Sequence, residues 1–299
     1  MKRFSVPAGL IFAGALLTAC TTSEQGDPAP SSPGSATSSA TTAPLQETLN
    51  YVALGDSYAA MGSRSAPTTG PGPCVRSTDN YPSLVLEEPN IEGIDVSCSS
   101  AVTEHILGDR LRQETIPAQV NSLKEDTDLI TLSIGGNDIY FGDIAACMYG
   151  AMDGSIPTTC ESQRGAKTNE MLGLLPARLD AVHEEIRRRS PNARVIVTGY
   201  FPMLTASGEC SEAGSISPTD KAWSIDLTAR LNGIISDVAS RHGAEFVLPE
   251  NTEQHTACAE PKERWVDVSG VFSDSYPMHP TPAGQVAMSE AVVGAVRDR

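Results

Sequence analysis

Short runs of consecutive apolar residues alternate along this chain with longer stretches in which apolar residues recur every three or four positions. The apolar runs, each short enough to be a buried strand, are 51–54, 94–96, 129–134, 194–198 and 245–248. The stretches with helical spacing are 172–186, 217–238 and 281–296. Continuous apolar strands that alternate with helices predict an α/β fold, in which a central, mostly parallel five-stranded sheet is covered on both faces.

Two of the predicted helices have clear starts. Ser217-Pro218 and Thr281-Pro282 each place an N-cap residue before a proline at the first helical position. Pro176 marks either a kink or the true start of the 172–186 helix. In parallel α/β sheets the ligand binds beyond the carboxyl ends of the strands. We therefore expect functional residues in the loops after Leu54, Val96, Ile134 and Val247.

The N-terminal segment has a different pattern, which resembles a bacterial lipoprotein signal. Two basic residues precede the apolar run 4–17, which is too short to span a bilayer comfortably. Cys20 then ends a Leu-Thr-Ala-Cys sequence that resembles the lipobox, in which the cysteine is lipidated before cleavage. The sequence therefore predicts a signal peptide over 1–19, lipidation of Cys20 and export to the extracytoplasmic face of the cell membrane. An ordinary secretory signal is the alternative, and it keeps the export but loses the anchor.

Composition separates a tether from a globular domain. Ser, Thr, Pro, Gly and Ala dominate residues 20–48, which predicts a solvated tether. Residues 49–299 have a globular composition with no second linker and no internal repeat, so we expect one domain. With 37 acidic and 21 basic residues, the chain has a net charge of −16. This charge disfavours nucleic acid and anionic lipid as partners. We expect a monomer that touches the membrane only through its anchor.

The cysteine count agrees with export. The chain has 7 cysteines, and assigning Cys20 to lipid leaves an even number, which suggests three disulfides in an exported protein. Six cysteines allow fifteen pairings, and the sequence alone does not choose among them. Our working hypothesis is the sequential set, Cys74–Cys98, Cys147–Cys160 and Cys210–Cys258. A zinc site is the competing interpretation, but no two cysteines have zinc-knuckle spacing and none neighbours a histidine.

Four polar blocks carry the candidate chemistry. In chain order they are Gly55-Asp56-Ser57-Tyr58, Cys98-Ser99-Ser100-Ala101, Gly135-Gly136-Asn137-Asp138 and Pro277-Met278-His279-Pro280. A serine hydroxyl is a weak nucleophile until a histidine takes its proton. The oxyanion formed in acyl transfer needs N–H donors, often from the backbone and an asparagine. Ser57, His279 and Asn137 are residues of these types, so the blocks indicate acyl transfer.

The four blocks, in this order, resemble the SGNH hydrolases, also called the GDSL esterase/lipase family. The resemblance implies a three-layer α/β/α hydrolase of carboxylic esters, with Ser57 as nucleophile and His279 as general base. It also implies an oxyanion hole formed by the backbone N–H groups of Ser57 and Ser100 and the side chain of Asn137. Three sequential disulfides are typical of the secreted branch of the family, which supports the pairing above. We expect neither a cofactor nor a metal.

Two positions depart from the usual pattern of this family. Ser100 stands where the family usually has glycine, and its N–H donor persists if the backbone conformation suits a non-glycine residue. Tyr276 stands three residues before the histidine, where the family usually has aspartate. Either Asp274 or Asp267 reaches the imidazole instead, or a main-chain carbonyl does. The secreted branch uses the carbonyl two residues before the histidine, and we therefore favour Pro277, with Asp274 as its rival.

Other polar residues have simpler interpretations. We expect Asp56 to support its turn and Asp138 to cap a helix that begins after Asn137. The remaining histidines, His105, His183, His242 and His255, are interpreted as structural or solvent-exposed.

The sequence leaves two other functions open. Many exported lipoproteins bind a solute without cleaving it, although such a protein does not need a Ser–His pair. A phospholipase or an acyltransferase can be built on the same fold. The ester itself is not readable, so short-chain esters, lipids, phospholipids and acetylated glycans are all candidates. The absence of Gly-x-Ser-x-Gly counts against an ordinary α/β-hydrolase.

Overall fold

A computed structural model describes residues 47–155, 158–206 and 210–298. The predicted signal peptide, Cys20 and nearly all of the predicted tether lie outside these residues, so the boundaries 1–19, 20–48 and 49–299 stay a prediction. No helix in the described part of the chain is both long enough and apolar enough to cross a membrane.

The predicted parallel sheet is confirmed, and all four of its strand pairs are parallel. Its five strands lie in the order β4-β1-β7-β8-β9. Their bounds are β1 Leu49–Gly55, β4 Ile91–Asp95, β7 Leu129–Ser133, β8 Arg194–Thr198 and β9 Glu245–Val247. The second strand begins before the apolar run 94–96, because β4 is an edge strand with three exposed residues and therefore lacks a clear apolar pattern.

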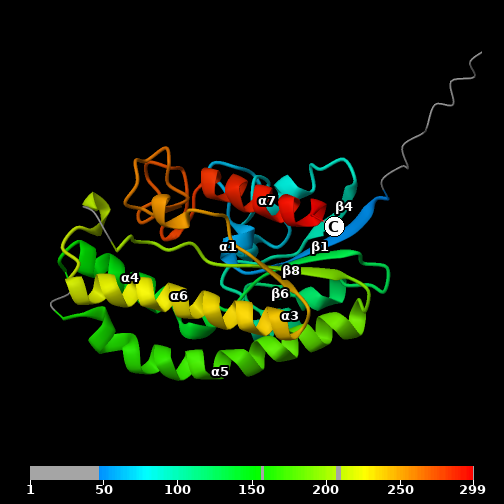
Figure 1. The fold of residues 1–299 in the computed structure, drawn as a ribbon, viewed down its shortest axis with the longest axis horizontal. Coiled ribbons are helices and arrows are strands. Elements are labelled where there is room, and N and C mark those ends of the chain that lie inside the picture. The colour runs from blue at the N-terminus through cyan, green and yellow to red at the C-terminus, as the bar shows by residue number, and fades with distance from the viewer. Residues whose placement is uncertain (1–46, 156–157, 207–209, 299) are drawn as a thin grey trace, which may run out of the picture. The chain divides into compact units, whose positions relative to one another are not determined.

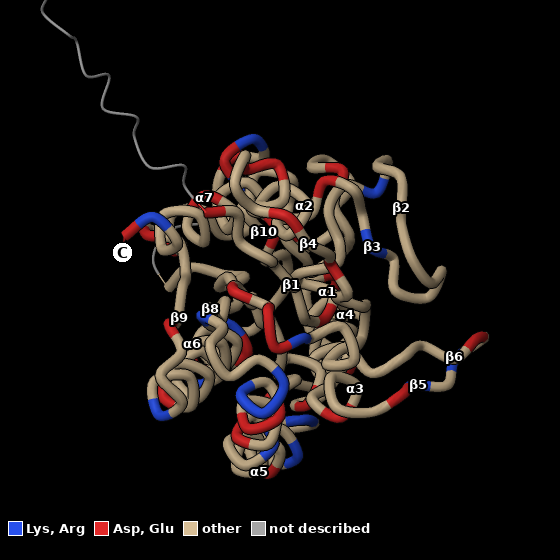
Figure 2. Tube along the Cα trace, turned by 90° about the vertical axis from the view of Figure 1, so that its right-hand side faces the viewer, with Lys and Arg blue, Asp and Glu red and all other residues tan. Residues whose placement is uncertain are grey.

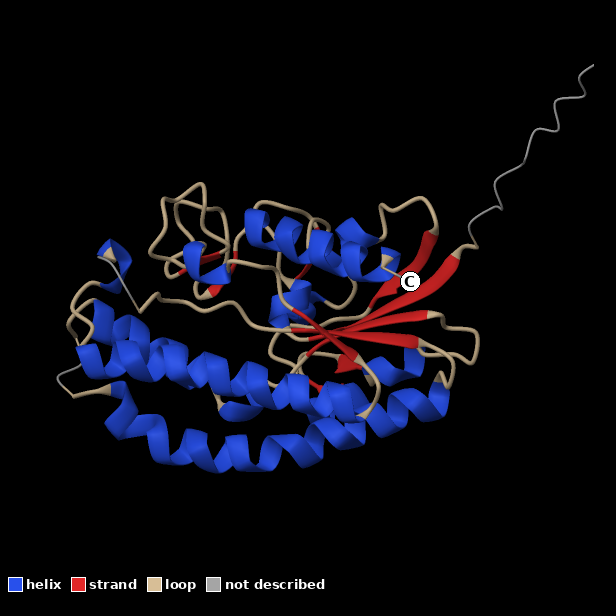
Figure 3. Cartoon of the chain, in the orientation of Figure 1, coloured by secondary structure: helices blue, strands red, loops and turns tan. Residues whose placement is uncertain are grey.

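Helices cover both faces of the sheet and complete the three-layer sandwich (Figures 1 and 3). The helices α2 (Tyr81–Val85) and α7 (Pro282–Arg297) pack together on one face, and α5 (Cys160–Arg189) and α6 (Pro218–Arg241) pack together on the other. The other helices are α1 Ser57–Ala60, α3 Thr103–Leu107 and α4 Phe141–Met152. The short strand pairs are β2 Thr68–Thr69 with β3 Arg76–Ser77, β5 Arg110–Leu111 with β6 Thr115–Ile116, and β10 Val266–Asp267 with β11 His279–Pro280.

The predicted helix starts agree with the structure at two of three places. The Ser217 side chain accepts a hydrogen bond from the Asp220 N–H, and Thr281 caps α7 in the same way. Pro176 lies inside α5, so its interpretation as a helix start is wrong. The helix begins sixteen residues earlier, at Cys160, where Thr159 caps it.

The burial and the order of the central strands determine where a site can form on this sheet. Every residue of β7 is buried, so this strand is a fixed central support for the loops at its carboxyl end. The chain leaves β1 for β4 on one side and then crosses to β7 on the other, which makes the carboxyl end of β1 a topological switch point. At the opposite end, Arg187, Arg188 and Arg189 form the last turn of α5 (Figure 2). Two of these arginines pair with Glu185, and their positive charges interact favourably with the partial negative charge at the C-terminal end of the helix.

The six cysteines after residue 46 form the sequential disulfides Cys74–Cys98, Cys147–Cys160 and Cys210–Cys258. This is the pairing taken above as the working hypothesis. It leaves none of these six thiols to bind zinc, so the competing zinc interpretation does not apply to them. The second disulfide joins α4 to the start of α5.

Candidate active site

The strand β1 delivers Ser57 to the carboxyl edge of the sheet. Ser57 is the first residue of α1, and Asp56 caps this helix by accepting a hydrogen bond from the Tyr58 N–H. Gly55 is required for the turn, because an added Cβ would lie 2.8 Å from the Ser133 oxygen. The Gln119 side chain holds the same turn, since it accepts from the Gly55 N–H at 2.7 Å and donates to the Gly55 oxygen at 2.8 Å.

Ser57 and His279 lie in direct contact although 222 positions separate them in the sequence. The Nε2 atom of His279 is 2.7 Å from the Ser57 Oγ. Its Nδ1 atom is 2.7 Å from the main-chain oxygen of Pro277. Because a carbonyl oxygen only accepts, Nδ1 carries the proton, and Nε2 is free to accept the serine proton.

The loop that carries His279 is held by hydrogen bonds on both sides. Residues Asp267 and His279 face each other in the antiparallel β10–β11 pair. Met278, whose φ is 59°, donates its N–H to the main-chain oxygen of Asp267 at 2.9 Å. Burial lowers the pKa of His279 from its usual 6.5, and the Pro277 carbonyl opposes this shift because it favours the charged ring.

Neither Asp274 nor Asp267 forms a hydrogen bond to the imidazole through its carboxylate, although Asp267 faces His279 across the strand pair. The Asp274 carboxylate accepts a hydrogen bond from the Ser65 hydroxyl. Asp267 is fully buried and accepts from the N–H groups of Ser269 and Gly270 and from the Ser273 hydroxyl. The hydrogen-bond partners of the two imidazole nitrogens are thus a serine hydroxyl and a main-chain carbonyl.

The groups expected to bind an oxyanion come from three loops. Ser100 has a φ of 59°, so it occupies the left-handed region in the position where glycine is usual. Among the described residues, no acceptor is found for the N–H of Ser57 or of Ser100. Asn137 donates one Nδ2 hydrogen to the Ala101 oxygen at 2.9 Å, and its second Nδ2 hydrogen is not committed there.

The loop of Ser100 is braced more firmly than its sequence suggests. The Cys74–Cys98 disulfide holds it on one side. The buried guanidinium of Arg110 donates to the Ser99 oxygen at 2.8 Å on the other. The disulfide holds Cys98 and the hydrogen bond from Arg110 holds Ser99, so both residues before Ser100 are fixed.

Glycine is needed at the two positions before Asn137 for different structural reasons. Gly135 has a φ of 120°, which favours glycine. Gly136 lies against the ring of Tyr200, and an added Cβ there would lie 2.9 Å from the ring.

The expectation that Asp138 caps the following helix is wrong, because α4 begins at Phe141 without a side-chain cap. Asp138 instead accepts from Thr103 at the start of α3 and pairs with Arg178.

The residue that sequence reasoning missed most clearly is Tyr200, which lies in the loop after β8. Its hydroxyl donates to the Asp56 carboxylate at 2.5 Å and accepts from the Gly136 N–H at 2.9 Å. Burial raises the pKa of Asp56 to about 7, although the hydrogen bonds from Tyr200 and Tyr58 oppose the shift. The available signal was its position, two residues beyond a predicted strand at the same edge of the sheet.

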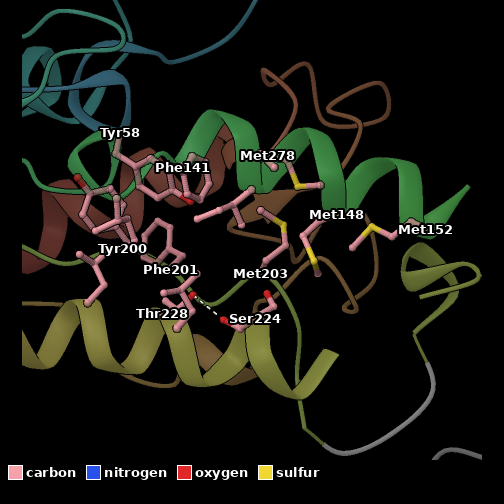
Figure 4. A pocket seen from close by; sticks show the side chains of 15 residues that line it. Tyr58, Phe141, Met148, Met152, Tyr200, Phe201, Met203, Ser224, Thr228 and Met278 are labelled. Carbon is pink, nitrogen blue, oxygen red and sulfur yellow. Dashed lines mark hydrogen bonds between the residues drawn. The ribbon is translucent and has the colours of Figure 1, made fainter. Parts of the chain in front are cut away.

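An apolar pocket is lined by Tyr58 and Met278, which are the sequence neighbours of Ser57 and His279 (Figure 4). The ring centroids of Tyr58 and Phe141 lie 5.6 and 6.5 Å from that of His279. From there the pocket runs between α4 and α6, and its lining includes Ile144, Ala145, Met148, Met152, Met203, Leu227, Leu231 and Met278. Its cavity volume is only about 40 Å³. The adaptable methionine side chains therefore have to move before a chain of several carbons fits.

A second, more open groove begins at Asn137. It has a cavity volume of about 650 Å³ and lies between α3 and α5. Its walls include Thr103, Tyr140 and Arg178. Tyr58 and Phe141 line the pocket, whereas the groove has Asn137 in its wall, so the candidate site has a narrow apolar branch and a second, wider branch.

Several known proteins are similar to this chain. A model of the GDSL-like lipase/acylhydrolase family matches residues 53–287. Lipase 2 of Streptomyces coelicolor is 32% identical over 264 residues, which cover 85% of this chain and 88% of that protein. The crystal structure of an extracellular lipase from Streptomyces rimosus has a TM-score of 0.70 at 28% identity, with 83% of this chain and 99% of that one covered. Phospholipase A1 from Streptomyces albidoflavus has a TM-score of 0.67 at 28% identity, with the same coverage of 83% and 99%.

Proposed function

This chain belongs to the GDSL-like lipase/acylhydrolase family and is a carboxylic-ester hydrolase, and from that premise we propose that it cleaves esters through a Ser57–His279 dyad. The observation that carries the proposal is the 2.7 Å contact between Ser57 Oγ and His279 Nε2. A protein that only binds a solute has no need of this contact. The proposal has the Pro277 carbonyl in the place of the usual triad carboxylate.

The proposed reaction has two halves. In the first, His279 takes the Ser57 proton while Oγ attacks the ester carbon, and the oxyanion is bound by the N–H groups of Ser57 and Ser100 and by Asn137. The intermediate then expels the alcohol, which receives the proton held on Nε2. In the second half, His279 takes a proton from a water molecule that attacks the acyl-enzyme. The new tetrahedral intermediate then releases the acid, and His279 returns the proton to the Ser57 Oγ.

The proton on Nδ1 stays on that atom throughout, hydrogen-bonded to the Pro277 oxygen. A neutral carbonyl stabilises the imidazolium less than a carboxylate does. The carbonyl nevertheless fixes the tautomer and the ring orientation, which are the geometric requirements of a general base.

The apolar pocket supports an aliphatic acyl group as the part of the substrate that it accepts. Phe141, Ala145, Met148 and Met152 share one face of α4, so the lining continues for the length of that helix. At a rise of about 1.5 Å per residue, this face is roughly 16 Å long. An acetyl group would leave most of it unused, which favours esters of longer fatty acids.

The experiment is hydrolysis of p-nitrophenyl esters from acetate to palmitate by the purified domain, with and without a serine-directed phosphonate inhibitor. Turnover that is lost after phosphonate treatment supports the proposal, and a higher kcat/KM for medium or long chains supports the acyl pocket. Absence of turnover and of inhibitor labelling would instead favour a solute-binding protein.

A second candidate substrate is a phospholipid ester. The observation that favours it is the likeness to a phospholipase A1 structure, in which 99% of that chain is covered. Release of fatty acid from phosphatidylcholine vesicles at a rate comparable to that from triacylglycerol would support this activity.

We also propose that the hydrolase is exported and anchored through lipid on Cys20. The Leu-Thr-Ala-Cys sequence after an apolar run supports the anchor, and the likeness to an extracellular lipase supports the export. Replacing Cys20 with Ser should release the protein from the cell membrane into the medium. Membrane association that persists in the Cys20→Ser protein would contradict the anchor.

A further inference from the structure

Tyr200 connects two parts of the candidate site that are far apart in the sequence. Its hydroxyl donates to Asp56, the residue before Ser57, and accepts from Gly136, the residue before Asn137. One oxygen atom therefore contacts both the turn that holds the proposed nucleophile and the loop that holds the proposed oxyanion donor. We propose that Tyr200 is a positioning residue that sets the distance between Ser57 and Asn137, an inference that rests on the proposed function.

Tyr200 is itself held in place by a helix outside the site. The Asn232 side chain on α6 accepts from the Tyr200 backbone N–H at 2.8 Å and donates to the Tyr200 main-chain oxygen at 2.8 Å. This pair of hydrogen bonds fixes the backbone of Tyr200, and the residue as a whole is 4% exposed. A side chain that is anchored at its backbone and enclosed along its ring can define a position for the groups bonded to its tip.

The surroundings are built around this ring. Gly136 has no side chain at the point where a Cβ would come within 2.9 Å of the Tyr200 ring. Tyr58, the residue after the proposed nucleophile, lies with its ring centroid 4.7 Å from that of Tyr200. The close approach of Gly136 allows the hydroxyl to reach the Gly136 N–H and Asp56 together.

The hydrogen-bond directions assign a state to Asp56. Its Oδ1 accepts from the Tyr58 N–H and its Oδ2 accepts from the Tyr200 hydroxyl, so both oxygens act as acceptors. This arrangement suits the ionised carboxylate. Burial and the charge of Asp138 raise the pKa of Asp56, whereas the hydrogen bond from Tyr200 lowers it. Removing the hydroxyl therefore loosens the oxyanion loop and weakens the cap on α1 in one step.

Tyr200 also forms part of the wall of the apolar pocket. The ring and the hydroxyl thus have separable roles, because the ring faces the acyl branch and the hydroxyl joins the two loops. A Tyr200→Phe change keeps the wall and removes only the connection. Since a misplacement of about 1 Å can cost about a hundredfold in rate, the change should lower kcat and leave KM nearly unaltered.

The test compares wild type, Tyr200→Phe and a matched control, Tyr51→Phe. Tyr51 is as deeply buried and its hydroxyl is bonded to Thr131 at 2.7 Å, but it lies at the start of β1 and away from the site. Hydrolysis of p-nitrophenyl butyrate and inhibition by an alkylboronic acid are measured for each. The boronic acid forms a tetrahedral adduct with a serine oxygen, so its affinity reports the oxyanion geometry.

We expect Tyr200→Phe to lose at least tenfold in kcat and in boronic acid affinity, with KM within twofold of wild type. Tyr51→Phe should lose stability but keep kcat. Unchanged kcat in Tyr200→Phe, or an equal loss in Tyr51→Phe, would overturn the inference while leaving the wild-type hydrolase intact. If Tyr200→Phe fails to fold, Asn232→Ala takes its place, and unchanged kcat in that variant overturns the inference. A wild type without turnover would instead refute the proposed function.

Discussion

The Nδ1 atom of His279 lies 2.7 Å from the main-chain oxygen of Pro277, two residues before it in the same loop. The imidazole is therefore oriented by its own backbone, and no aspartate is needed to select its tautomer. Tyr276 stands where the family usually has the triad aspartate, and the carbonyl accounts for how the ring is held without it. This relationship leads to the first two predictions.

The first prediction concerns Asp274, the rival for the imidazole. In enzymes that use a triad aspartate, replacing it with asparagine costs about 10⁴ in kcat. Because Asp274 bonds to Ser65 in this structure, Asp274→Asn should cost at most about tenfold, through altered loop packing. The measurement is kcat on a short-chain ester, with folding checked by circular dichroism. A loss of a thousandfold or more would show a true Ser–His–Asp triad.

Asp267→Asn provides the matched comparison for that variant. The buried Asp267 carboxylate accepts four hydrogen bonds in the loop that leads to His279 and pairs with Arg264. The change should therefore lower the free energy of unfolding by about 1–3 kcal/mol, while kcat of the folded protein stays within about tenfold.

The second prediction concerns the pH dependence of hydrolysis. A general base must be neutral in the free enzyme, and burial lowers the pKa of His279 below 6.5. The ring consequently stays neutral to a lower pH than an exposed histidine does, and protonation of His279 should lower kcat/KM only as the pH drops below 6.5. A profile of kcat/KM from pH 4 to 9 checks this. An acid limb centred above pH 7 would contradict the environment assigned to His279.

The sequence predicted the parts of the molecule that are set by local patterns. Strands such as 129–133 are continuous apolar runs because both of their faces are buried, and Ser217 and Thr281 cap their helices through contacts three residues away. Ser57 and His279 were found as members of family blocks, and the structure places them in contact.

The remaining features depend on contacts between distant segments. Gln119 acts on Gly55 and Tyr200 acts on Gly136 across 64 positions each, and neither residue has a local signature. The local sequence around Asp138 predicts a helix cap, whereas its partners in the structure are the distant residues Thr103 and Arg178. The apolar pocket needs α4, whose sequence has no capping side chain and was not predicted as a helix.

The third prediction concerns acyl-chain length. Met148 is 4% exposed and lies in the pocket wall about two turns along α4 from Phe141. Met148→Trp should block the pocket beyond that point and lower kcat/KM for palmitate esters at least tenfold. Hydrolysis of butyrate esters should stay within about threefold. Met148→Leu, which conserves volume, serves as the control and should preserve both activities. Equal losses on both esters would argue against this pocket as the acyl site.

The fourth prediction concerns the disulfide next to Ser100. The Cys74–Cys98 bond spans 24 positions, and its removal by paired alanine changes should cost about 3 kcal/mol of unfolding free energy. The same change should lower kcat, since Cys98 lies two residues before Ser100. Removing Cys210–Cys258, which spans 48 positions, should cost about 4 kcal/mol and leave kcat within about twofold. Urea unfolding measures the stability of the two variants, and ester hydrolysis measures their kcat. Equal kcat in both variants would show that the Cys74–Cys98 disulfide does not position the loop of Ser100.

The central claim is that Ser57 is the nucleophile, and active-site labelling tests it most directly. The protein is treated with a fluorophosphonate, digested and analysed by mass spectrometry, beside a Ser57→Ala protein whose fold is verified by its thermal unfolding. The account predicts a single adduct on the peptide that contains Ser57, none in Ser57→Ala, and a loss of more than about a thousandfold in that variant's kcat. An adduct on another residue, or a Ser57→Ala protein that retains more activity than this, would contradict the account.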